Sequence, residues 1–393
     1  MVQQEKIEQA IGVLRELNMD VWMLYARETS EIAEPCWSVV APAGVVWPAA
    51  IIITAKGERF AIVGKHDDAA YRASGLYTDV LTYTQGIGET LRNMLAELDP
   101  KTIGLNFSKS NTAADGLTYG MFLQLQDHLR GTPFAERLAS ADAVVSRVRG
   151  RKTPSEAKLI RAAIDTTMKL FAEVTPHIKV GATERELYDF MQRRVSELGL
   201  GFAWEQAGNP IVNTGPHSTV GHGPPTSNLK VEAGHVIHMD FGVKQDEYCS
   251  DVQRCWYVLR SGESEPPASV RKACEAVTTT IAEGAKVLKP GALGWQVDQR
   301  ACEVITSFGY AEYQHAFGHQ LGRTAHDGST LLGPRWERYG DTPYGVIEPG
   351  QVFTLELGVP TEAGMVALDE DVIVTENGCE FLEEAQTQLW LVR

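Results

Sequence analysis

Hydrophobic and polar positions alternate with two different periods along the first 145 or so residues. Residues 7–17 and 118–129 carry apolar side chains at the three- and four-residue spacing of amphipathic helices. Strand-like apolar runs stand between them, at residues 20–25, 49–54, 59–63, 80–83 and 102–106. Strands interleaved with helices predict an α/β layer domain. This region has no Gly-rich phosphate loop and no His/Asp cluster, so we expect the domain to have a capping, positioning or dimerising role.

A basic run at residues 147–152 separates this domain from a second one with longer helical patterns. We therefore predict domains at residues 1–147 and 148–393. Thr153 to Glu156 form a capping box with Pro154 at the first helical position, and Thr183 to Glu186 form a second box. Apolar residues at helical spacing after the first box predict an ordinary core helix.

The second domain repeats itself along the chain. Residues 172–200 align with residues 282–310, and each unit reads as helix, Lys-x-Gly turn, helix. VEAGHVIHMDFGV at 231–243 also aligns with IEPGQVFTLELGV at 347–359, which puts Glu356 where Asp240 stands. The domain is predicted to contain two related halves, each a helix pair followed by a hairpin that carries carboxylates.

The first of these hairpins, residues 235–257, contains Asp240 and Asp251 on either side of a polar turn. A turn midway between them would place the two carboxylates directly opposite each other. Like charges so placed need a proton or a cation between them. Because the first strand is otherwise largely apolar, we interpret the pair as a metal site rather than a solvated pair.

In the second hairpin, Glu356 needs an acidic partner, and Asp369, Glu370 and Asp371 are available. Asp369 preserves an even-numbered loop centred on residues 362–363. Side chains alternate between the two faces of a strand, so only one of Asp369 and Glu370 is expected to point at the site. Loop parity favours Asp369, while the longer reach of Glu keeps Glu370 as an alternative.

Histidines supply the remaining metal-ligand type. His315, His319 and His326 lie close together among glycines, which permit close backbone approach to a site. A site with several carboxylates and one His suits Mn²⁺, with Co²⁺, Zn²⁺ or Fe²⁺ as alternatives. Because so many acids would overcharge one ion, we predict two divalent ions about 3.5–4 Å apart.

The charge balance of the chain limits the kinds of molecule that it is expected to bind. Lys and Arg total 36 against 51 Asp and Glu, a net charge of −15, which argues against nucleic acid or an anionic membrane as partner. The polar, amphipathic start of the chain does not resemble a signal peptide, and no apolar run of about 18 residues occurs. We expect a cytoplasmic protein that acts on a small molecule.

At this point the chain resembles a known family. The ordered set Asp240, Asp251, His319, Glu356 and an acid at 369 or 370, preceded by KTPSEAKLIRAA, is similar to that of the pita-bread metallopeptidases (M24 type). These include Xaa-Pro dipeptidase (prolidase), aminopeptidase P and, more distantly, methionine aminopeptidase. The resemblance implies a creatinase/prolidase-like α/β N-terminal domain and an α+β pita-bread (creatinase/aminopeptidase-like) catalytic domain with internal pseudo-twofold duplication.

The resemblance also implies roles for individual residues. Asp240 and Asp251 would bind one metal ion, with Asp251 bridging, and His319 would bind the other. Glu356 and the last acid would bridge both ions, and Glu356 would shuttle the proton from the attacking water to the leaving nitrogen.

Three further histidines acquire roles by the same resemblance. His222 matches the family's histidine on the substrate side. His326 matches the histidine that polarises the carbonyl or stabilises the oxyanion. His315 would line the substrate pocket.

One departure concerns the substrate carboxylate. The family usually has Arg-x-Glu-Asp before the final strand, where this chain has Ala367, Leu368, Asp369 and Glu370. That Arg often helps to hold the substrate carboxylate, so Arg335 or Arg338 are candidate substitutes.

The resemblance favours cleavage of dipeptides with proline at the second position, by a homodimer. An aminopeptidase P acting on longer peptides is the first alternative. A catalytically silent binding protein and a metal-free creatinase-like hydrolase are further alternatives, disfavoured because the acid-plus-His set is complete.

Overall fold

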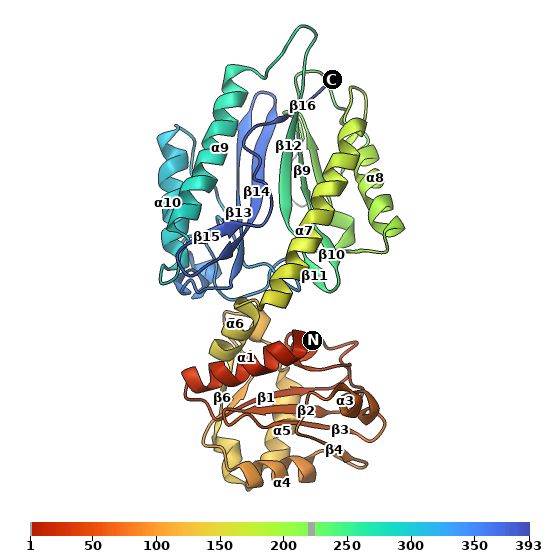
Figure 1. The fold of residues 1–393 in the computed structure, drawn as a ribbon, viewed down its shortest axis with the longest axis vertical. Coiled ribbons are helices and arrows are strands. Elements are labelled where there is room, and N and C mark those ends of the chain that lie inside the picture. The colour runs from red at the N-terminus through yellow and green to blue at the C-terminus, as the bar shows by residue number, and fades with distance from the viewer. Residues whose placement is uncertain (1, 219–224) are drawn as a thin grey trace. The chain divides into compact units, whose positions relative to one another are not determined.

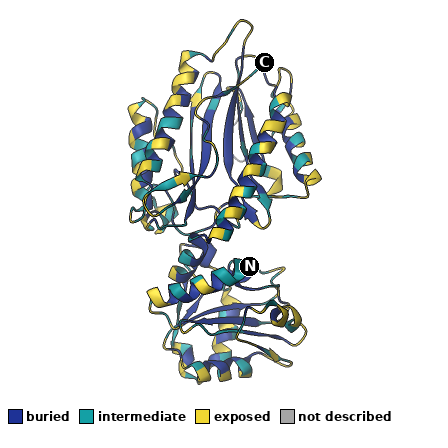
Figure 2. Cartoon of the chain, in the orientation of Figure 1, coloured by how far each residue is buried: buried dark blue, intermediate teal, exposed yellow. Residues whose placement is uncertain are grey.

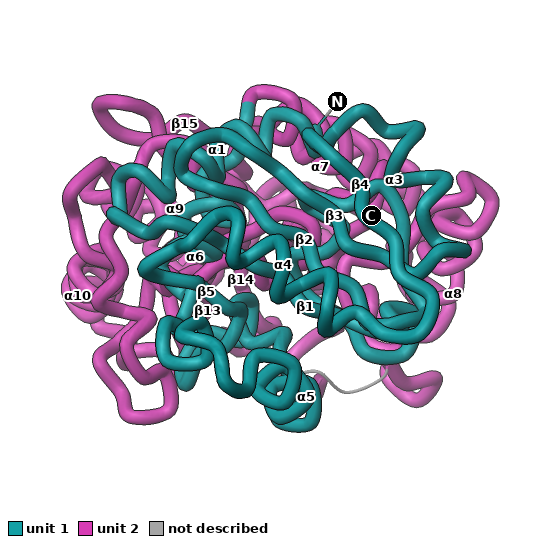
Figure 3. The backbone as a smooth tube through the Cα atoms, turned by 90° about the horizontal axis from the view of Figure 1, so that it is seen from below, with its two compact units in different colours: residues 1–153 teal, residues 154–393 magenta. Residues whose placement is uncertain are grey.

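The computed structural model describes residues 2–218 and 225–393 of the chain. The chain divides into two compact units, Met1–Thr153 and Pro154–Arg393 (Figure 3). The boundary predicted from the basic run, between residues 147 and 148, falls inside helix α6 (Asp142–Gly150). No helix in the described part of the chain is long and apolar enough to cross a membrane.

The first unit is built on a six-stranded sheet with strand order β4-β3-β2-β1-β5-β6. Its strands are β1 (Val21–Ala26), β2 (Ala49–Thr54), β3 (Arg59–Gly64), β4 (Asp79–Tyr83), β5 (Ile103–Leu105) and β6 (Leu138–Ser140). Strand β2 runs antiparallel to both β1 and β3, whereas the other pairs are parallel. The five strands predicted from apolar runs are all confirmed.

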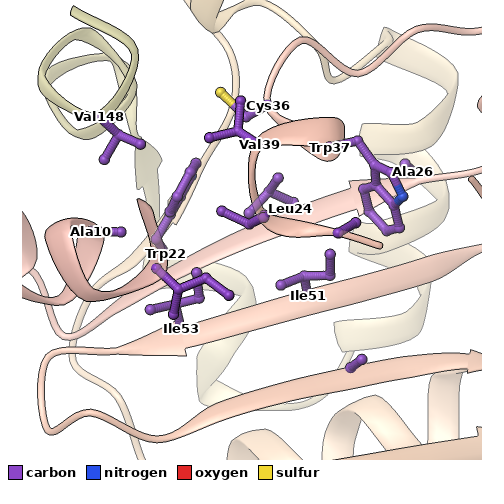
Figure 4. Packing of buried hydrophobic residues seen from close by; sticks show 14 of the residues in the cluster. Ala10, Trp22, Leu24, Ala26, Cys36, Trp37, Val39, Ile51, Ile53 and Val148 are labelled. Atoms are coloured by element: carbon purple, nitrogen blue, oxygen red, sulfur yellow. The ribbon is translucent and has the colours of Figure 1, made fainter. Parts of the chain in front are cut away.

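Helices cover this sheet and bury both faces of its central strands. They are α1 (Val2–Glu16), α2 (Trp37–Val40), α3 (Asp68–Ser74), α4 (Gly88–Leu98), α5 (Tyr119–Leu129) and α6. On one face Trp22 and Leu24 of β1 pack with Ile51 and Ile53 of β2 and with Val148 of α6 (Figure 4). The unit therefore has its own core, as an α/β layer domain requires.

The second unit contains two helix pairs and a larger sheet (Figure 1). The helices are α7 (Pro154–Val174), α8 (Glu184–Glu197), α9 (Ala268–Val287) and α10 (Gly294–Ser307). Helix α7 begins at the predicted Pro154, and the capping box between Thr183 and Glu186 is present at the start of α8. Short 3₁₀ helices occur in both units. Those of the first unit are η1 (Thr112–Ala114) and η2 (Pro133–Glu136), and those of the second are η3 (Thr175–His177), η4 (Gln206–Gly208), η5 (Glu337–Tyr339) and η6 (Thr342–Tyr344).

Seven strands form the main sheet of this unit, in the order β13-β14-β12-β9-β8, with β15 on β14 and β16 on β12. They are β8 (Ile211–Thr214), β9 (Val236–Phe241), β12 (Val252–Val258), β13 (Val352–Thr361), β14 (Gly364–Val374), β15 (Cys379–Phe381) and β16 (Trp390–Val392). A smaller sheet contains β7 (Gly201–Phe202), β10 (Val243–Gln245) and β11 (Tyr248–Cys249). Helix α9 packs on β13 and β14, and α8 packs on β8, so the main sheet is largely buried (Figure 2).

The two predicted halves share local structure at their turns. The amide of Gly181 donates to the carbonyl of Val231 at 2.9 Å, and the amide of Gly291 donates to the carbonyl of Ile347 at the same distance. Both glycines have positive φ, 92° and 87°, which a residue with a side chain rarely adopts. These matched bonds support the duplication, while a pseudo-twofold axis between the halves stays a prediction.

Candidate metal centre

The first hairpin has a different register from the predicted one. Asp240 lies opposite Gln253, not opposite Asp251. The turn is formed by Asp246 and Glu247, one residue later than the midpoint, and both have positive φ, 48° and 70°. The partner of Asp240 changes by two residues, which is an even number, so the side chains that shared a face still do so. They are those of Asp240, Asp251 and Gln253. Asp251 is thus diagonal to Asp240, which separates the two charges more than direct opposition would.

A glycine makes room for this arrangement. Gly242 lies between β9 and β10, where a Cβ atom would come within 2.1 Å of the carbonyl oxygen of Ser250. Ser250 immediately precedes Asp251, so the close backbone approach at Gly242 lets the chain bring Asp251 back beside Asp240.

The second hairpin has the predicted register. Glu356 on β13 lies directly opposite Asp369 on β14, and the turn falls at residues 362–363. Glu370 points to the other face, where it accepts a hydrogen bond from a guanidinium nitrogen of Arg254 at 2.9 Å. Both of these side chains are almost fully buried. Because successive side chains of a strand point to opposite faces, Asp369, and not Glu370, lies on the face that carries Asp240 and Glu356.

A backbone pairing brings His319 to this face from a distant part of the sequence. The amide of His319 donates to Thr354 Oγ1 at 3.1 Å, and the amide of Thr354 donates to the carbonyl of His319 at 2.9 Å. His319 Nε2 consequently lies 3.5 Å from Asp251 Oδ2 and 3.8 Å from Glu356 Oε1. The predicted acid-plus-His set is assembled from five separate segments: β9, the residue before β12, the loop with His319, β13 and β14.

His326 is the nearest of the other predicted histidines. Its ring centre lies 4.2 Å from that of His319. Burial, and next the neighbouring His326, lower the pKa of His319 to about 3. His319 is therefore a neutral imidazole at physiological pH, the form that can bind a metal ion.

The carboxylates on this face are crowded, and some oxygens of Asp240 and Asp369 accept no hydrogen bond from the described residues. Burial, followed by the charge of Glu356, raises the pKa of Asp240 and of Asp369 well above the usual range. Burial and then Asp240 do the same for Asp251. Among the described residues, no donor bonds Asp240 Oδ1 or either carboxylate oxygen of Asp369. Buried oxygens left in this way require protons or cations.

The donor set is suited to divalent metal ions, since it consists of carboxylate oxygens and one imidazole nitrogen. As these side chains stand, no group of three or more His, Cys, Asp and Glu within residues 2–218 and 225–393 is arranged to hold a metal ion. Mutual repulsion keeps uncompensated carboxylates apart, and a cation removes that repulsion. Both carboxylate oxygens of Asp369 are buried and accept no hydrogen bond from the described residues, which fits the metal ions that the family resemblance implies.

Sequence reasoning did not assign a role to three polar residues on the same face. Asp371 follows Asp369 by two positions and is fully buried, and its Oδ2 accepts from the amide of Asp251 at 3.3 Å. Gln253 follows Asp251 by two positions, and His238 precedes Asp240 by two. The two-residue period of a strand was the signal that could have found them.

The predicted substrate residues do not all lie at one place. His315 and Arg335 line one cavity of about 390 Å³, in which the guanidinium of Arg335 stacks 4.4 Å above the ring of Trp295. His319 and His326 line a different, smaller cavity of about 90 Å³. Arg338 stacks on Trp336 and Tyr339. His222 lies outside the described residues.

We expect metal binding to strengthen as the pH rises through the raised pKa values of the site carboxylates, with release of protons. The pKa values of Asp240, Asp251 and Asp369 are raised in the metal-free fold, so protons persist on these groups to higher pH and must leave before an ion binds. For the same reason, the metal-free protein loses stability as the pH rises through these raised values.

Calorimetric titration with Mn²⁺ in buffers of different ionisation enthalpy measures both the affinity and the protons released. An affinity that does not change with pH, with no proton release, would contradict the expectation.

Comparisons with known proteins identify the family to which the chain is similar. A model described as metallopeptidase family M24 matches residues 158–376. An uncharacterized peptidase of Staphylococcus haemolyticus is 29% identical over 290 residues, 73% of this chain and 75% of that protein. A Xaa-Pro dipeptidase of Pyrococcus furiosus is 26% identical over 281 residues, 71% of this chain and 76% of that protein.

Solved structures match the whole length. The Xaa-Pro dipeptidase from Bacillus anthracis has a TM-score of 0.75 at 23% identity, covering 99% of this chain and 100% of that one. The X-Pro aminopeptidase from Thermotoga maritima has a TM-score of 0.71 at 24% identity, covering 98% and 99%. These likenesses confirm the fold, an N-terminal α/β domain followed by a pita-bread domain.

Proposed function

Because this chain belongs to metallopeptidase family M24, we propose that it is a metal-dependent dipeptidase that hydrolyses the Xaa-Pro bond of dipeptides. The observation that carries the proposal is the pair formed by Glu356 and Asp369 across two strands, with the oxygens of Asp369 unpaired among the described residues. A metal-free hydrolase or a silent binding protein would have no use for these uncompensated charges, which destabilise the fold.

We assign the metal ligands to Asp240, Asp251, His319, Glu356 and Asp369. Glu370 is not assigned, because its carboxylate is bonded to Arg254 on the other face. We propose two divalent ions, with Mn²⁺ preferred and Co²⁺, Zn²⁺ or Fe²⁺ as alternatives. When bound, they would supply the Lewis acidity that polarises the scissile carbonyl and acidifies the attacking water.

Glu356 is the proposed general base. One of its oxygens, Oε1, faces His319, and its side chain is about a quarter exposed, so that solvent water can reach it. It would take the proton of the attacking water and deliver it to the proline nitrogen as the peptide bond breaks. His326 stands beside His319, where an N–H group would stabilise the developing oxyanion, and His222 would contact the substrate.

The free carboxylate of a dipeptide needs a cation, and Ala367 cannot provide one. Arg335 is the proposed substitute. It shares a cavity with His315, and its guanidinium stacks on Trp295, which limits its motion and leaves its N–H edges available. We propose a cytoplasmic homodimer, as expected from the sequence.

The specificity proposal is tested by relative rates on Ala-Pro and Ala-Pro-Ala with Mn²⁺ present. A dipeptidase is expected to cleave Ala-Pro faster, because a residue after proline would remove the carboxylate from the reach of Arg335. Release of the N-terminal alanine is measured for both peptides.

The alternative is an aminopeptidase P, which the missing Arg at position 367 favours. Fast cleavage of Ala-Pro-Ala with neglect of Ala-Pro would establish that alternative and overturn the dipeptidase assignment. A parallel assay on Ala-Ala checks that proline is required.

A further inference from the structure

The same face of the sheet carries an uncharged side chain at its centre, Gln253. We propose that Gln253 is a positioning residue that orients the carboxylate of Glu356. His238 fixes the orientation of the Gln253 amide by a hydrogen bond. The inference rests on the proposed function in one respect, since it takes Glu356 to be a metal ligand and base.

Gln253 lies between two acids of the site. It is opposite Asp240 on β9 and opposite Asp369 on β14, so its side chain leaves the sheet between their carboxylates. It is 7% exposed. Its amide nitrogen donates to Glu356 Oε2 at 3.0 Å. Gln253 is thus a hydrogen-bond donor to Glu356 that brings no charge to a crowded acidic face.

A hydrogen bond on the other side fixes the orientation of this amide. Gln253 Oε1 lies 2.9 Å from His238 Nε2. A carboxylate only accepts hydrogen bonds, so the NH₂ group must face Glu356 and the carbonyl must face His238. His238 Nε2 therefore carries a hydrogen and donates a hydrogen bond to Gln253 Oε1. His238 is itself buried, and its Nδ1 lies 3.0 Å from Asn213 Oδ1.

The consequence is a distinction between the two oxygens of Glu356. Oε2 is bonded to Gln253, while Oε1 faces His319 at 3.8 Å. Without the amide, the carboxylate of Glu356 would turn more freely and would move away from Asp240 and Asp369, which repel it. Partners that orient a metal-binding side chain typically contribute about 10–100-fold to metal affinity or activity.

The test replaces Gln253 with Met, which keeps the length of the side chain and removes both hydrogen bonds. We expect Q253M to weaken Mn²⁺ binding by about 10–100-fold in calorimetric titration, or to lower kcat by that factor with KM nearly unchanged. Gln386→Met is the matched control. Gln386 is also buried and bonded, to Cys255 on β12, but no ligand assigned here contacts its side chain within the described residues.

Q386M is expected to lower thermal stability and leave Mn²⁺ affinity unchanged, which separates positioning from general support of the fold. If Q253M proves unfolded, His238→Phe serves as the second variant, because it keeps Gln253 but removes the hydrogen bond that orients its amide. We expect H238F to weaken Mn²⁺ binding or lower kcat by a smaller factor. Wild-type Mn²⁺ affinity and wild-type kcat in a folded Q253M or H238F would overturn the proposal, as would an equal loss of affinity in Q386M.

Mn²⁺ titration needs no peptide, so the result is independent of substrate choice. Failure of the wild-type protein to cleave Ala-Pro would overturn the dipeptidase assignment and leave the role of Gln253 decided by the affinity data.

Discussion

Glu356→Gln is expected to lower kcat on Ala-Pro by about 10²–10⁴-fold, the usual contribution of a general base. The amide of Gln cannot accept the proton of the attacking water, although it fills the same space on β13. The fold is expected to survive, because the change removes one negative charge from a face where Asp240, Asp251 and Asp369 already repel each other. Proline release and thermal unfolding followed by circular dichroism measure the two effects.

Glu380→Gln is the matched control for this substitution. Glu380 is an exposed residue of β15 in the same unit, so its loss is expected to change neither activity nor stability appreciably. Activity of E356Q near that of the wild type would refute the role of Glu356 as base. Unfolding of E356Q would show instead that Glu356 supports the fold.

Asp369 and Glu370 are neighbours in sequence whose neutral variants are expected to behave in opposite ways. Asp369→Asn is expected to abolish tight Mn²⁺ binding and turnover, yet to raise the stability of the metal-free protein. The reason is that the pKa of Asp369 is raised by burial and by Glu356, so its ionised form opposes folding at neutral pH.

Glu370→Gln is expected to leave the metal site in place and to destabilise the protein. It removes the carboxylate that pairs with the buried Arg254, a change that costs up to about 3–5 kcal/mol when a buried charge is left alone. Glu383 lies 3.8 Å from the same guanidinium and will reduce that cost.

Metal stoichiometry, measured by elemental analysis, and the free energy of unfolding in urea with and without Mn²⁺ distinguish the two variants. Loss of metal in E370Q with full metal binding in D369N would show that the last ligand is Glu370. That result would contradict the strand parity on which our assignment rests.

The strand period and the internal repeat allowed much of the second unit to be predicted. The match of 231–243 with 347–359 identified Glu356, and an even loop length predicted its pairing with Asp369, which the structure confirms. This worked because β13 and β14 form one long uninterrupted ladder, so that parity counted from the turn holds along its whole length.

The same reasoning failed for the first hairpin, for a local reason. Asp246 and Glu247 form the turn with positive φ, the combination that a type I′ turn requires and that Asn-Gly normally supplies. Without such a pair, nothing in the sequence marks the turn. Pairing of β9 with β12 and the close approach at Gly242 decide the register, and these depend on the whole sheet.

By itself, the sequence determined the α/β class of the first unit, the order of the acids along the chain and the face on which each acid lies, because helical and strand periods are local properties. The pita-bread fold of the second unit was predicted only by resemblance to a family. Only the tertiary structure decided which side chains meet. His319 reaches the site through its backbone pairing with Thr354, and Gln253 comes to lie between Asp240 and Asp369 because three strands are adjacent. Such neighbours are set by the pairing of distant strands, which no period along one strand encodes.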